Sequence, residues 1–250
     1  MSSYKTTKRK SQVRKRATRP SSTLRRVSQK QLEAYLDPTP ASMPLVEQTN
    51  ALSQDEFIAQ YVRDSDLSYD FPAKEETGHY KAEVYTASMI SETDFEACFR
   101  LIELTSKDAY VASSGGWSPA KKRREMRLPD MKYLVVRARG SEDVVGFSSF
   151  MVTYEDGREV LYVYEIHLGP EVQGRGLGGF LVGVMDGIGE RVRLEKMMLT
   201  CFRSNVQAMG FYGHIGFTVD EYSPQPHRLR NGTVKEPDYS ILSRPLRGRA

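Results

Sequence analysis

The sequence predicts an α/β fold in which a mixed central sheet is flanked by helices. Three observations support this prediction. From about residue 79 onward, segments with the two-residue period of strands alternate with segments that have the helical period. Residues 144–168 contain two long strand patterns joined by a tight turn, which predicts an antiparallel hairpin. A glycine-rich turn then joins the second of these strands to a helix pattern, so that a further strand can pair in parallel.

Capping signals mark the starts of the expected helices. Ser91 stands before the acidic residues Glu92 and Asp94, which favour a helix N-terminus. Ser118 followed by Pro119 predicts a second start. We expect the helix after Ser91 to end at a Ser-Gly-Gly break (114–116) and to bury Phe95, Cys98, Phe99, Ile102 and Leu104. The other expected helices are 31–36, 51–62, 120–127, 180–195 and 205–214.

Apolar alternation and turn residues mark the expected strands. His79–Thr86 alternates between apolar and polar residues, as a half-buried strand does. The residues Glu155, Asp156, Gly157 and Arg158 predict the turn of the long hairpin. The expected strands are 79–86, 133–138, 144–153, 159–168, 197–202, 217–221 and 239–244, and residues 66–72 are expected to form a loop.

Charge divides the chain of 250 residues into a basic arm and an acidic body. Residues 1–30 contain eleven Lys and Arg and no acidic residue, whereas the remainder has 25 basic and 32 acidic residues. A segment so rich in charge and poor in apolar residues predicts a disordered arm. Two basic clusters, at 8–10 and 14–16, are typical of nuclear import, and the same charges would attract rRNA or DNA. We therefore expect a nuclear and cytoplasmic protein, with a helical extension and linker over 31–78 and the main domain over 79–245.

Composition excludes several classes of protein. Cys98 and Cys201 are the only cysteines and form no CxxC motif, which argues against a disulfide scaffold and a thiolate zinc site. The four histidines show no metal-ligand spacing, so we predict no metal and give them no catalytic role. No apolar run reaches the roughly 18 residues of a membrane span. We expect a soluble monomer without membrane contact.

The glycine-rich turn Gln173–Gly179 carries the sharpest chemical signal. Glycines there would let the backbone approach phosphate oxygens, and the free N–H groups of the following helix would attract a pyrophosphate. A tight strand–helix connection is the structural alternative. A dinucleotide-binding fingerprint does not fit, because the next strand does not end in Asp or Glu. A Walker A loop does not fit, because the sequence lacks Gly-Lys-Ser/Thr after the turn.

The turn resembles the acetyl-CoA motif Gln/Arg-x-x-Gly-x-Gly/Ala of the GNAT acetyltransferase superfamily. Gln173, Gly176 and Gly178 occupy its fixed positions, and the order of elements over about 79–245 is similar to the GNAT fold. The resemblance implies that acetyl-CoA is the co-substrate. The residues it implies for binding are Ile166, His167, Leu168, Gln173, Gly174, Arg175, Gly176, Leu177, Gly178, Gly179 and Asn205.

Further segments resemble one GNAT family, the NatD N-alpha-acetyltransferases of histone four and histone two-A. These segments are Trp117, Glu159–Glu165, Arg175–Gly178, Met198–Thr200, Asn205 and Asp238–Arg244, together with the basic arm. The resemblance implies that acetyl-CoA donates an acetyl group directly to the α-amine of a substrate that begins Ser-Gly-Arg-Gly. Histone N-terminal peptides are therefore the expected partners, with ribosome or nucleic-acid contact through the arm.

The same resemblance implies roles for residues on the peptide side. Glu165 would be the catalytic carboxylate with Tyr164 beside it, while Trp117, Tyr162 and Tyr239 would bind the peptide. In an unbroken strand Glu165 would point away from Tyr162 and Tyr164, but a β-bulge, which the GNAT fold has there, would re-aim it. The structural alternatives are core packing for Trp117, a tyrosine pair on a sheet and an exposed glutamate. Asn205 is equally suited to cap a helix.

Glu155 falls where the NatD pattern places a carboxylate for the third-position Arg of the substrate, although a solvated hairpin tip is the alternative reading. The partner position of that pattern is Thr153, so one acidic group stands where the family has two. Two rival functions remain open from the sequence. One is a GNAT enzyme that acetylates lysine side chains or polyamines, and the other is a non-catalytic protein that binds acetyl-CoA or nucleic acid.

Overall fold

The computed structural model describes residues 43–71, 78–228, 230 and 232–246. The predicted basic arm (1–30) and the predicted helix at 31–36 lie outside the described residues. Within the described residues, no helix is both long and apolar enough to cross a membrane.

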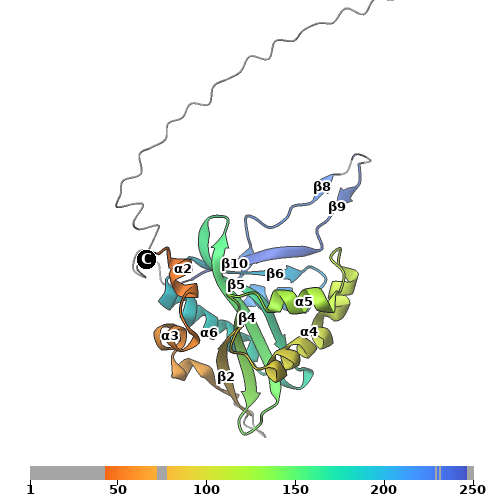
Figure 1. The fold of residues 1–250 in the computed structure, drawn as a ribbon. Helices are drawn as coiled ribbons and strands as arrows, with labels where there is room; N and C mark the ends of the chain where they lie inside the picture. The colour runs from red at the N-terminus through yellow and green to blue at the C-terminus, as the bar shows by residue number, and fades with distance from the viewer. Residues whose placement is uncertain (1–42, 72–77, 229, 231, 247–250) are drawn as a thin grey trace, which may run out of the picture. The chain divides into compact units, whose positions relative to one another are not determined.

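An eight-stranded sheet forms the centre of the described body (Figure 1). Its strand order is β1-β2-β3-β4-β5-β6-β10-β7, and β8 and β9 form a separate two-stranded sheet. All neighbouring strands of the large sheet pair antiparallel except β5 and β6, which pair in parallel. The strands are β1 Ser68–Phe71, β2 Gly78–Thr86, β3 Lys132–Ala138, β4 Val144–Glu155, β5 Arg158–Leu168, β6 Lys196–Phe202, β7 Thr218–Val219, β8 His227–Arg228, β9 Val234–Lys235 and β10 Tyr239–Pro245. The predicted mixed sheet flanked by helices is therefore confirmed.

The sheet separates two apolar clusters, and β3 shows this division most directly. Tyr133 and Val135 belong to one cluster, while Leu134 and Val136 belong to the other. Successive strand residues point to opposite faces, so both faces of β3 are buried. Helices α4 and α5 pack on one face, and α2, α3 and α6 pack on the other (Figure 1). The helices are α2 Leu45–Asn50, α3 Gln54–Tyr61, α4 Glu92–Ala112, α5 Pro119–Met126, α6 Leu177–Val192 and α7 Val206–His214, with short 3₁₀ turns at Asp64–Leu67 and Pro170–Val172.

Two helix starts follow the predicted capping chemistry. The Ser91 side chain accepts a hydrogen bond from the Asp94 amide at 3.0 Å, and Ser118 caps α5 ahead of Pro119. Four of the five residues predicted on the buried side of α4 are buried, but Leu104 is 64% exposed, so that prediction is wrong. Leu104 follows Ile102 by two residues, which turns its side chain about 200° around the helix axis from that of Ile102.

The N-terminal extension contributes a strand that the sequence did not predict. Ser68–Phe71 pairs with β2, with Ser68 opposite Lys81, so the expectation of a loop over residues 66–72 is wrong at these four positions. Four residues give too short a pattern for a strand to be recognised without its partner. The predicted helix at 51–62 begins only at Gln54, because Ser53 and Glu56 form a capping box there.

Three other predicted boundaries also move. Helix α6 starts at Leu177, three residues before the predicted start, because Gly176 at φ +81° already turns the chain into the helix. It ends at Val192 because Arg193 adopts a left-handed conformation, before the predicted end at residue 195. The predicted strand 217–221 is reduced to Thr218–Val219, and beyond it the Asp220 side chain pairs with Lys196 at 2.6 Å.

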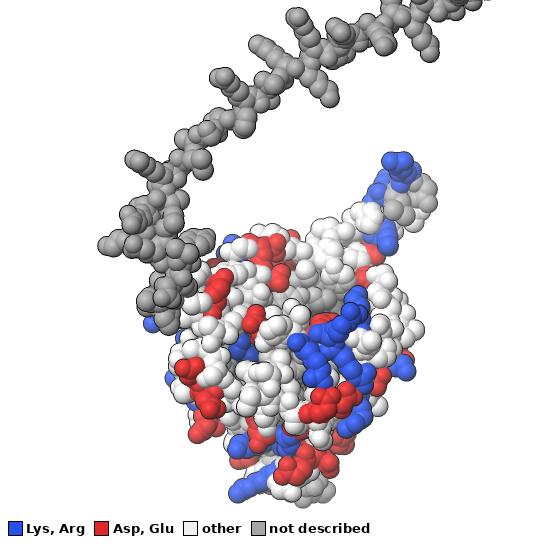
Figure 2. Space-filling model, in the orientation of Figure 1, with Lys and Arg blue, Asp and Glu red and all other residues white. Residues whose placement is uncertain are grey.

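Basic side chains gather over α5 on the face shown in Figure 2. Part of this charge is neutralised by α4, since Arg123 pairs with Glu96 at 2.8 Å and Arg127 pairs with Glu92 at 2.7 Å. The same two guanidinium groups lie over the rings of phenylalanines on α4. The basic helix is therefore fixed to α4 by packing as well as by charge.

Candidate active site

The sheet opens between β5 and β6. Their parallel pairing covers only four residue pairs and stops at Val163 opposite Leu199, although both strands continue. At the same point the register between β4 and β5 shifts: Ser149 faces Glu165, whereas Phe150 faces Val163. Tyr164 is therefore the extra residue of a β-bulge, as the resemblance to the GNAT fold implied. The bulge places Glu165 at the opening of the sheet.

Glu165 is the centre of a buried polar network. Its Oε1 accepts a hydrogen bond from Lys122 Nζ at 2.9 Å, and its Oε2 lies 2.6 Å from His167 Nε2. The hydroxyl of Tyr110 accepts from the same Lys122 at 2.7 Å and lies 3.4 Å from Glu165 Oε1. Lys122 also pairs with Glu125 at 3.0 Å. Both oxygens of Glu165 are thus engaged, and its side chain is only 7% exposed.

The charges of this network stabilise one another. Burial by itself would raise the pKa of Glu165, but the hydrogen bond and charge of His167 and the charge of Lys122 outweigh it and lower that pKa to about 2. Burial opposes the charge of Lys122, yet Glu165, Tyr110 and Glu125 hold its pKa above the ordinary value. Burial and the charge of Glu165 raise the pKa of Tyr110. Around neutral pH the network therefore contains a carboxylate, an ammonium and a neutral phenol.

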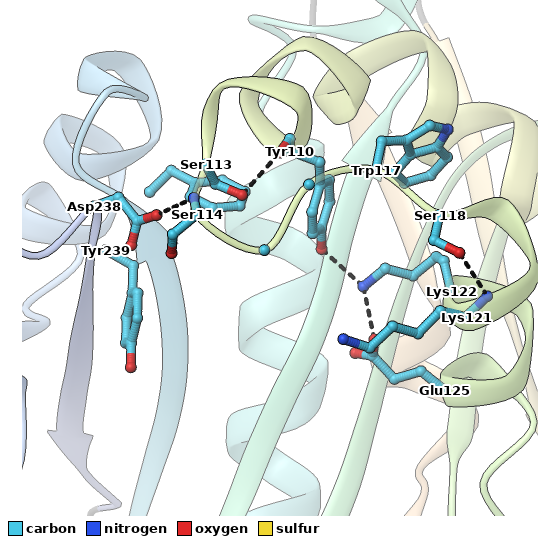
Figure 3. A pocket seen from close by; sticks show the side chains of 13 residues that line it. Tyr110, Ser113, Ser114, Trp117, Ser118, Lys121, Lys122, Glu125, Asp238 and Tyr239 are labelled. Carbon is cyan, nitrogen blue, oxygen red and sulfur yellow. Dashed lines mark hydrogen bonds and ion pairs between the residues drawn. The ribbon is translucent and has the colours of Figure 1, made fainter.

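A cavity of about 240 Å³ lies on the α5 side of this network (Figure 3). Lys122 and Tyr110 reach its wall from α5 and α4. The ring of Trp117 stacks on Phe99 at 5.9 Å and lies 5.4 Å from the ring of Tyr110. The other residues that line the cavity are Ser113, Ser114, Gly115, Gly116, Ser118, Lys121, Glu125, Phe202, Asp238 and Tyr239. Two residues that the sequence assigned to the peptide, Trp117 and Tyr239, therefore meet at one cavity although 122 positions separate them.

The loop that carries Trp117 is tied to β10. The amide of Ser114 donates to Asp238 Oδ2 at 2.7 Å, and this bond lowers the pKa of Asp238. The bond fixes the end of α4 beside Tyr239, which follows Asp238 directly. One wall of the cavity is therefore held to the other by a charged hydrogen bond.

Tyr162 and Tyr164 lie side by side, with ring centroids 5.3 Å apart. The Tyr162 hydroxyl lies 2.6 Å from Thr200 Oγ1. Burial raises the pKa of both tyrosines, and the charge of Glu155 contributes to both shifts, so Glu155 acts on this part of the site from the end of β4. Glu155 is half-buried and does not line the Trp117 cavity.

A second, larger cavity of about 570 Å³ lies where the glycine-rich turn meets α6. Its volume is within the range of about 300–1,000 Å³ of small-molecule sites. Gly174 and Gly176 have φ of +73° and +81°, and a Cβ at Gly174 or Gly179 would meet no atom within 4 Å, so the backbone itself is open to the cavity. The first intrahelical bond runs from Phe180 N–H to Gly176 O, so the preceding amides lie at the free helix end.

This cavity fits the coenzyme that the turn predicts. Helix α6 is 16 residues long and begins among glycines. Its N-terminus offers N–H donors and a partial positive charge to a pyrophosphate. Most of the predicted cofactor residues line the cavity together: Ile166, His167, Leu168, Gln173, Gly174, Gly176, Leu177, Gly178, Gly179 and Asn205. Their chemical role stays a prediction.

Arg175 is the predicted cofactor residue that does not line the cavity. Its guanidinium donates to the Tyr80 hydroxyl at 3.1 Å, and its carbonyl accepts from the Tyr69 hydroxyl at 3.0 Å. Asn205 lines the cavity and also caps α7, accepting from the Ala208 amide at 3.0 Å. The cap role that the sequence offered for Asn205 is thus confirmed.

Sequence reasoning missed three polar residues of the site. Lys122 sits in a strongly basic helix, and only the fold shows it to be buried. Tyr110 lies near the end of α4, two turns beyond the predicted buried side chains. His167 was expected in the cofactor wall, but its bond to Glu165 was not, although two-residue spacing on a strand places both side chains on one face. Among the described residues, no three His, Cys, Asp or Glu side chains gather as a metal site.

The comparisons with known proteins agree with this geometry. Residues 98–217 match the family model described as the acetyltransferase (GNAT) family. The chain is 30% identical over 156 residues to N-alpha-acetyltransferase 40 of Saccharomyces cerevisiae, a match that covers 52% of this chain and 54% of the yeast protein. The aligned part thus spans about half the length of that relative.

Solved structures with a similar fold include the ribosomal-protein-S18-alanine N-acetyltransferase of Escherichia coli, at 18% identity and a TM-score of 0.45, covering 66% of this chain and 94% of that chain. Another is the PaiA N-acetyltransferase of Thermoplasma acidophilum in complex with coenzyme A, at 16% identity and a TM-score of 0.47, covering 66% of this chain and 99% of that chain. Residues 98–217 therefore resemble the GNAT acetyltransferase family, and the mixed sheet that opens beside a glycine-rich turn is the GNAT fold.

Proposed function

We propose that this chain moves the acetyl group of acetyl-CoA to the α-amine of a protein N-terminus, and that histone N-termini beginning Ser-Gly-Arg-Gly are its substrates. One observation carries the proposal: Glu165 is bonded to residues of two different cavities. His167 lines the cavity at the glycine-rich turn, whereas Lys122 and Tyr110 line the cavity beside Trp117. A donor bound on one side and an amine bound on the other would meet at the opening of the sheet.

An α-amine is a suitable acceptor for this site, because the Glu165 carboxylate is a weak base. An α-amine has a pKa of about 7.7–8.0, against about 10.4 for a lysine side chain. Near neutral pH about a tenth or more of the α-amine is therefore already neutral, against less than about a tenth of a percent of lysine. The pKa of Glu165 is lowered to about 2, so it is too weak a base to deprotonate a free lysine efficiently.

In this proposal Glu165, with Tyr164 beside it, receives the amine proton only as the new C–N bond forms and the thioester C–S bond breaks, and coenzyme A leaves as the thiolate. The amine nitrogen becomes more acidic at that moment, and a weak base can then accept its proton. Acetyl-CoA supplies an activated thioester. The chain's own residues would bind its pyrophosphate at the start of α6, keep the carbonyl beside the opening of the sheet and exclude water with the aromatic wall of Trp117 and Tyr110.

Glu155 is the proposed recognition group for the third-position Arg of the substrate. Burial and the neighbouring charge of Asp156 raise the pKa of Glu155, so its charge lacks full compensation in the free protein. A guanidinium bound beside it would supply that compensation and would form a charge-assisted hydrogen bond. Thr153, on the same strand, supplies no second charge.

The direct experiment is an acetylation assay with a Ser-Gly-Arg-Gly peptide whose α-amine is free or blocked. The proposal expects transfer to the free peptide only. Equal transfer to a blocked peptide that contains lysine would instead indicate a side-chain acetyltransferase. Binding of acetyl-CoA without transfer to any amine would indicate a non-catalytic protein.

A further inference from the structure

Glu125 lines the cavity beside Trp117 and has no role in the transfer proposed above. Its side chain is 36% exposed, against 7% for Glu165, so a ligand in the cavity can reach it. Figure 3 shows its carboxylate extending from α5 toward the cavity, next to the ammonium group of Lys122. One oxygen, Oε2, lies 3.0 Å from Lys122 Nζ. The other, Oε1, has no hydrogen bond or ion pair within the described residues.

Lys122 has no donor left for a ligand, because its three N–H groups are already engaged. They face Tyr110 at 2.7 Å, Glu165 at 2.9 Å and Glu125 at 3.0 Å. The Tyr110 hydroxyl in turn donates toward Glu165 at 3.4 Å. Lys122 therefore holds the network together, and the second oxygen of Glu125 is left as an acceptor at the cavity wall.

The charge around the cavity favours a cation. The wall and the network behind it carry two ammonium groups and three carboxylates, namely Lys121, Lys122, Glu125, Glu165 and Asp238. A ligand with one positive charge would balance them. The aromatic rings in the wall favour the same charge, because their faces are electron-rich and attract ammonium groups.

We propose that Glu125 binds the N-terminal ammonium group of the acceptor peptide, an inference that rests on the transfer to α-amines proposed above. Near neutral pH most of an α-amine is charged, so this is the form in which a peptide arrives. Burial, and after it the charge of Glu125, raise the pKa of Tyr164, so the Glu125 carboxylate acts on the bulge at the opening of the sheet. Glu125 and Glu165 share Lys122, which puts the two carboxylates one hydrogen-bonded group apart.

This contact acts on binding and not on the chemical step. A carboxylate beside an ammonium group favours the charged form, whereas only the neutral amine attacks the thioester. Removing the negative charge of Glu125 therefore weakens capture of the peptide without slowing the reaction of the bound complex. The acetylated product is an uncharged amide, so it loses this contact and dissociates. Glu125 is in this way a specificity residue that separates a free N-terminus from an acetylated one.

Isothermal titration calorimetry at about pH 6.5, where the α-amine is charged, tests the contact directly. Coenzyme A replaces acetyl-CoA, so that no transfer occurs. Two peptides are compared: Ser-Gly-Arg-Gly, and the same peptide with 3-hydroxypropanoic acid in place of serine, which keeps the hydroxyl group and lacks the amine. Glu125→Gln should raise the Kd of the first peptide about tenfold and leave that of the second unchanged.

Two further variants serve as controls. Glu125→Asp keeps the negative charge and should keep most of the preference for the peptide with the amine. Glu96→Gln is the matched control, because Glu96 has a similar exposure of 31% and pairs with Arg123 of the same helix α5, but does not line the cavity. It should change the Kd of neither peptide.

Kinetics separates this binding role from a catalytic or a purely structural one. With acetyl-CoA, Glu125→Gln should raise the KM for Ser-Gly-Arg-Gly about tenfold, while kcat falls by no more than about twofold. A catalytic carboxylate would instead lower kcat. The same rise in KM is expected for Ser-Gly-Ala-Gly, because Glu125 contacts the amine and not the Arg side chain.

An equal change in Kd for the peptides with and without the amine, or no change for either, would overturn the inference. The failure of the proposed function has a different signature. A protein in which Glu125→Gln weakens only the peptide with the amine, but whose wild type forms no acetylated α-amine, would support the contact and count against the proposed function alone.

Discussion

Glu165 shows how strongly one residue depends on its surroundings. In the sequence it is one acidic residue among 32. In the structure it is a buried carboxylate that Lys122 and His167 hold in the charged form. Breaking such a pair leaves an uncompensated charge, which costs far more than losing a surface pair.

This network predicts a particular pH dependence of stability. The pKa of Glu165 is lowered from 4.5 to about 2, so its contribution is fully present above pH 4.5 and is lost as the pH falls toward 2. We expect the difference in free energy of unfolding between wild type and Glu165→Gln to shrink by about 3 kcal/mol over that range. Urea unfolding at several pH values measures it. Glu92→Gln, which removes an exposed partner of Arg127, should change stability by at most about 1 kcal/mol at every pH.

Substrate selection is tested at Glu155. Glu155→Gln keeps the shape of the side chain and removes its charge. A charge-assisted hydrogen bond to a guanidinium contributes about 1.5–3 kcal/mol, so kcat/KM for Ser-Gly-Arg-Gly should fall about tenfold to a hundredfold. A Ser-Gly-Ala-Gly peptide should be nearly unaffected, and Thr153→Asp should increase the preference for Arg. Equal losses on both peptides would show that Glu155 supports the fold or the chemistry instead.

At the scale of elements, the glycine-rich turn is held from behind by the N-terminal extension. Tyr69 on β1 donates to the Arg175 carbonyl, and its ring stacks on Phe180 at 5.2 Å. A Cβ added at Gly176 would lie 2.3 Å from the Tyr69 hydroxyl. The turn therefore depends both on the left-handed glycine and on a strand more than 100 residues earlier.

Gly176→Ala should consequently raise the KM for acetyl-CoA, because the added methyl group strains the backbone and displaces Tyr69. We expect an increase of about tenfold, corresponding to about 1.4 kcal/mol, with a smaller effect on the KM for peptide. Gly183→Ala in the same helix is the control: its Cβ meets no atom, so KM should stay unchanged while the protein gains about 0.5–1 kcal/mol of stability. An unchanged KM in a folded Gly176→Ala protein would mean that this turn holds no phosphate.

Elements with strong local signals could be predicted from the sequence, and those defined by distant partners could not. Helix α4 has a serine cap and a regular apolar side, and β5 has a long apolar alternation, so both were located within a few residues. β1 is a strand only because β2 pairs with it. The burial of Lys122 likewise depends on β5. Its partner on that strand, Glu165, lies 43 residues later in the sequence. The glycine-rich turn was recognisable because its residues are contiguous.

At the scale of the whole molecule, the basic arm and the described body carry opposite charge in the sequence. The site residues all belong to the described body, so deleting residues 1–30 should leave kcat on a tetrapeptide within about twofold of the full chain. Retention on a polyanion column and nuclear accumulation should both decrease, because the deleted segment carries eleven basic residues. A large loss of kcat on the tetrapeptide would instead place part of the arm in the active site.

The proposed function requires the two cavities on either side of Glu165 to bring acetyl-CoA and a protein α-amine together. The most direct measurement is tandem mass spectrometry of the product formed from a peptide that begins Ser-Gly-Arg-Gly and also contains lysine. We expect the acetyl group on the α-nitrogen of the serine, and we expect Glu165→Gln to slow its appearance greatly. An acetyl group found on the lysine side chain, with the α-amine unmodified, would contradict it.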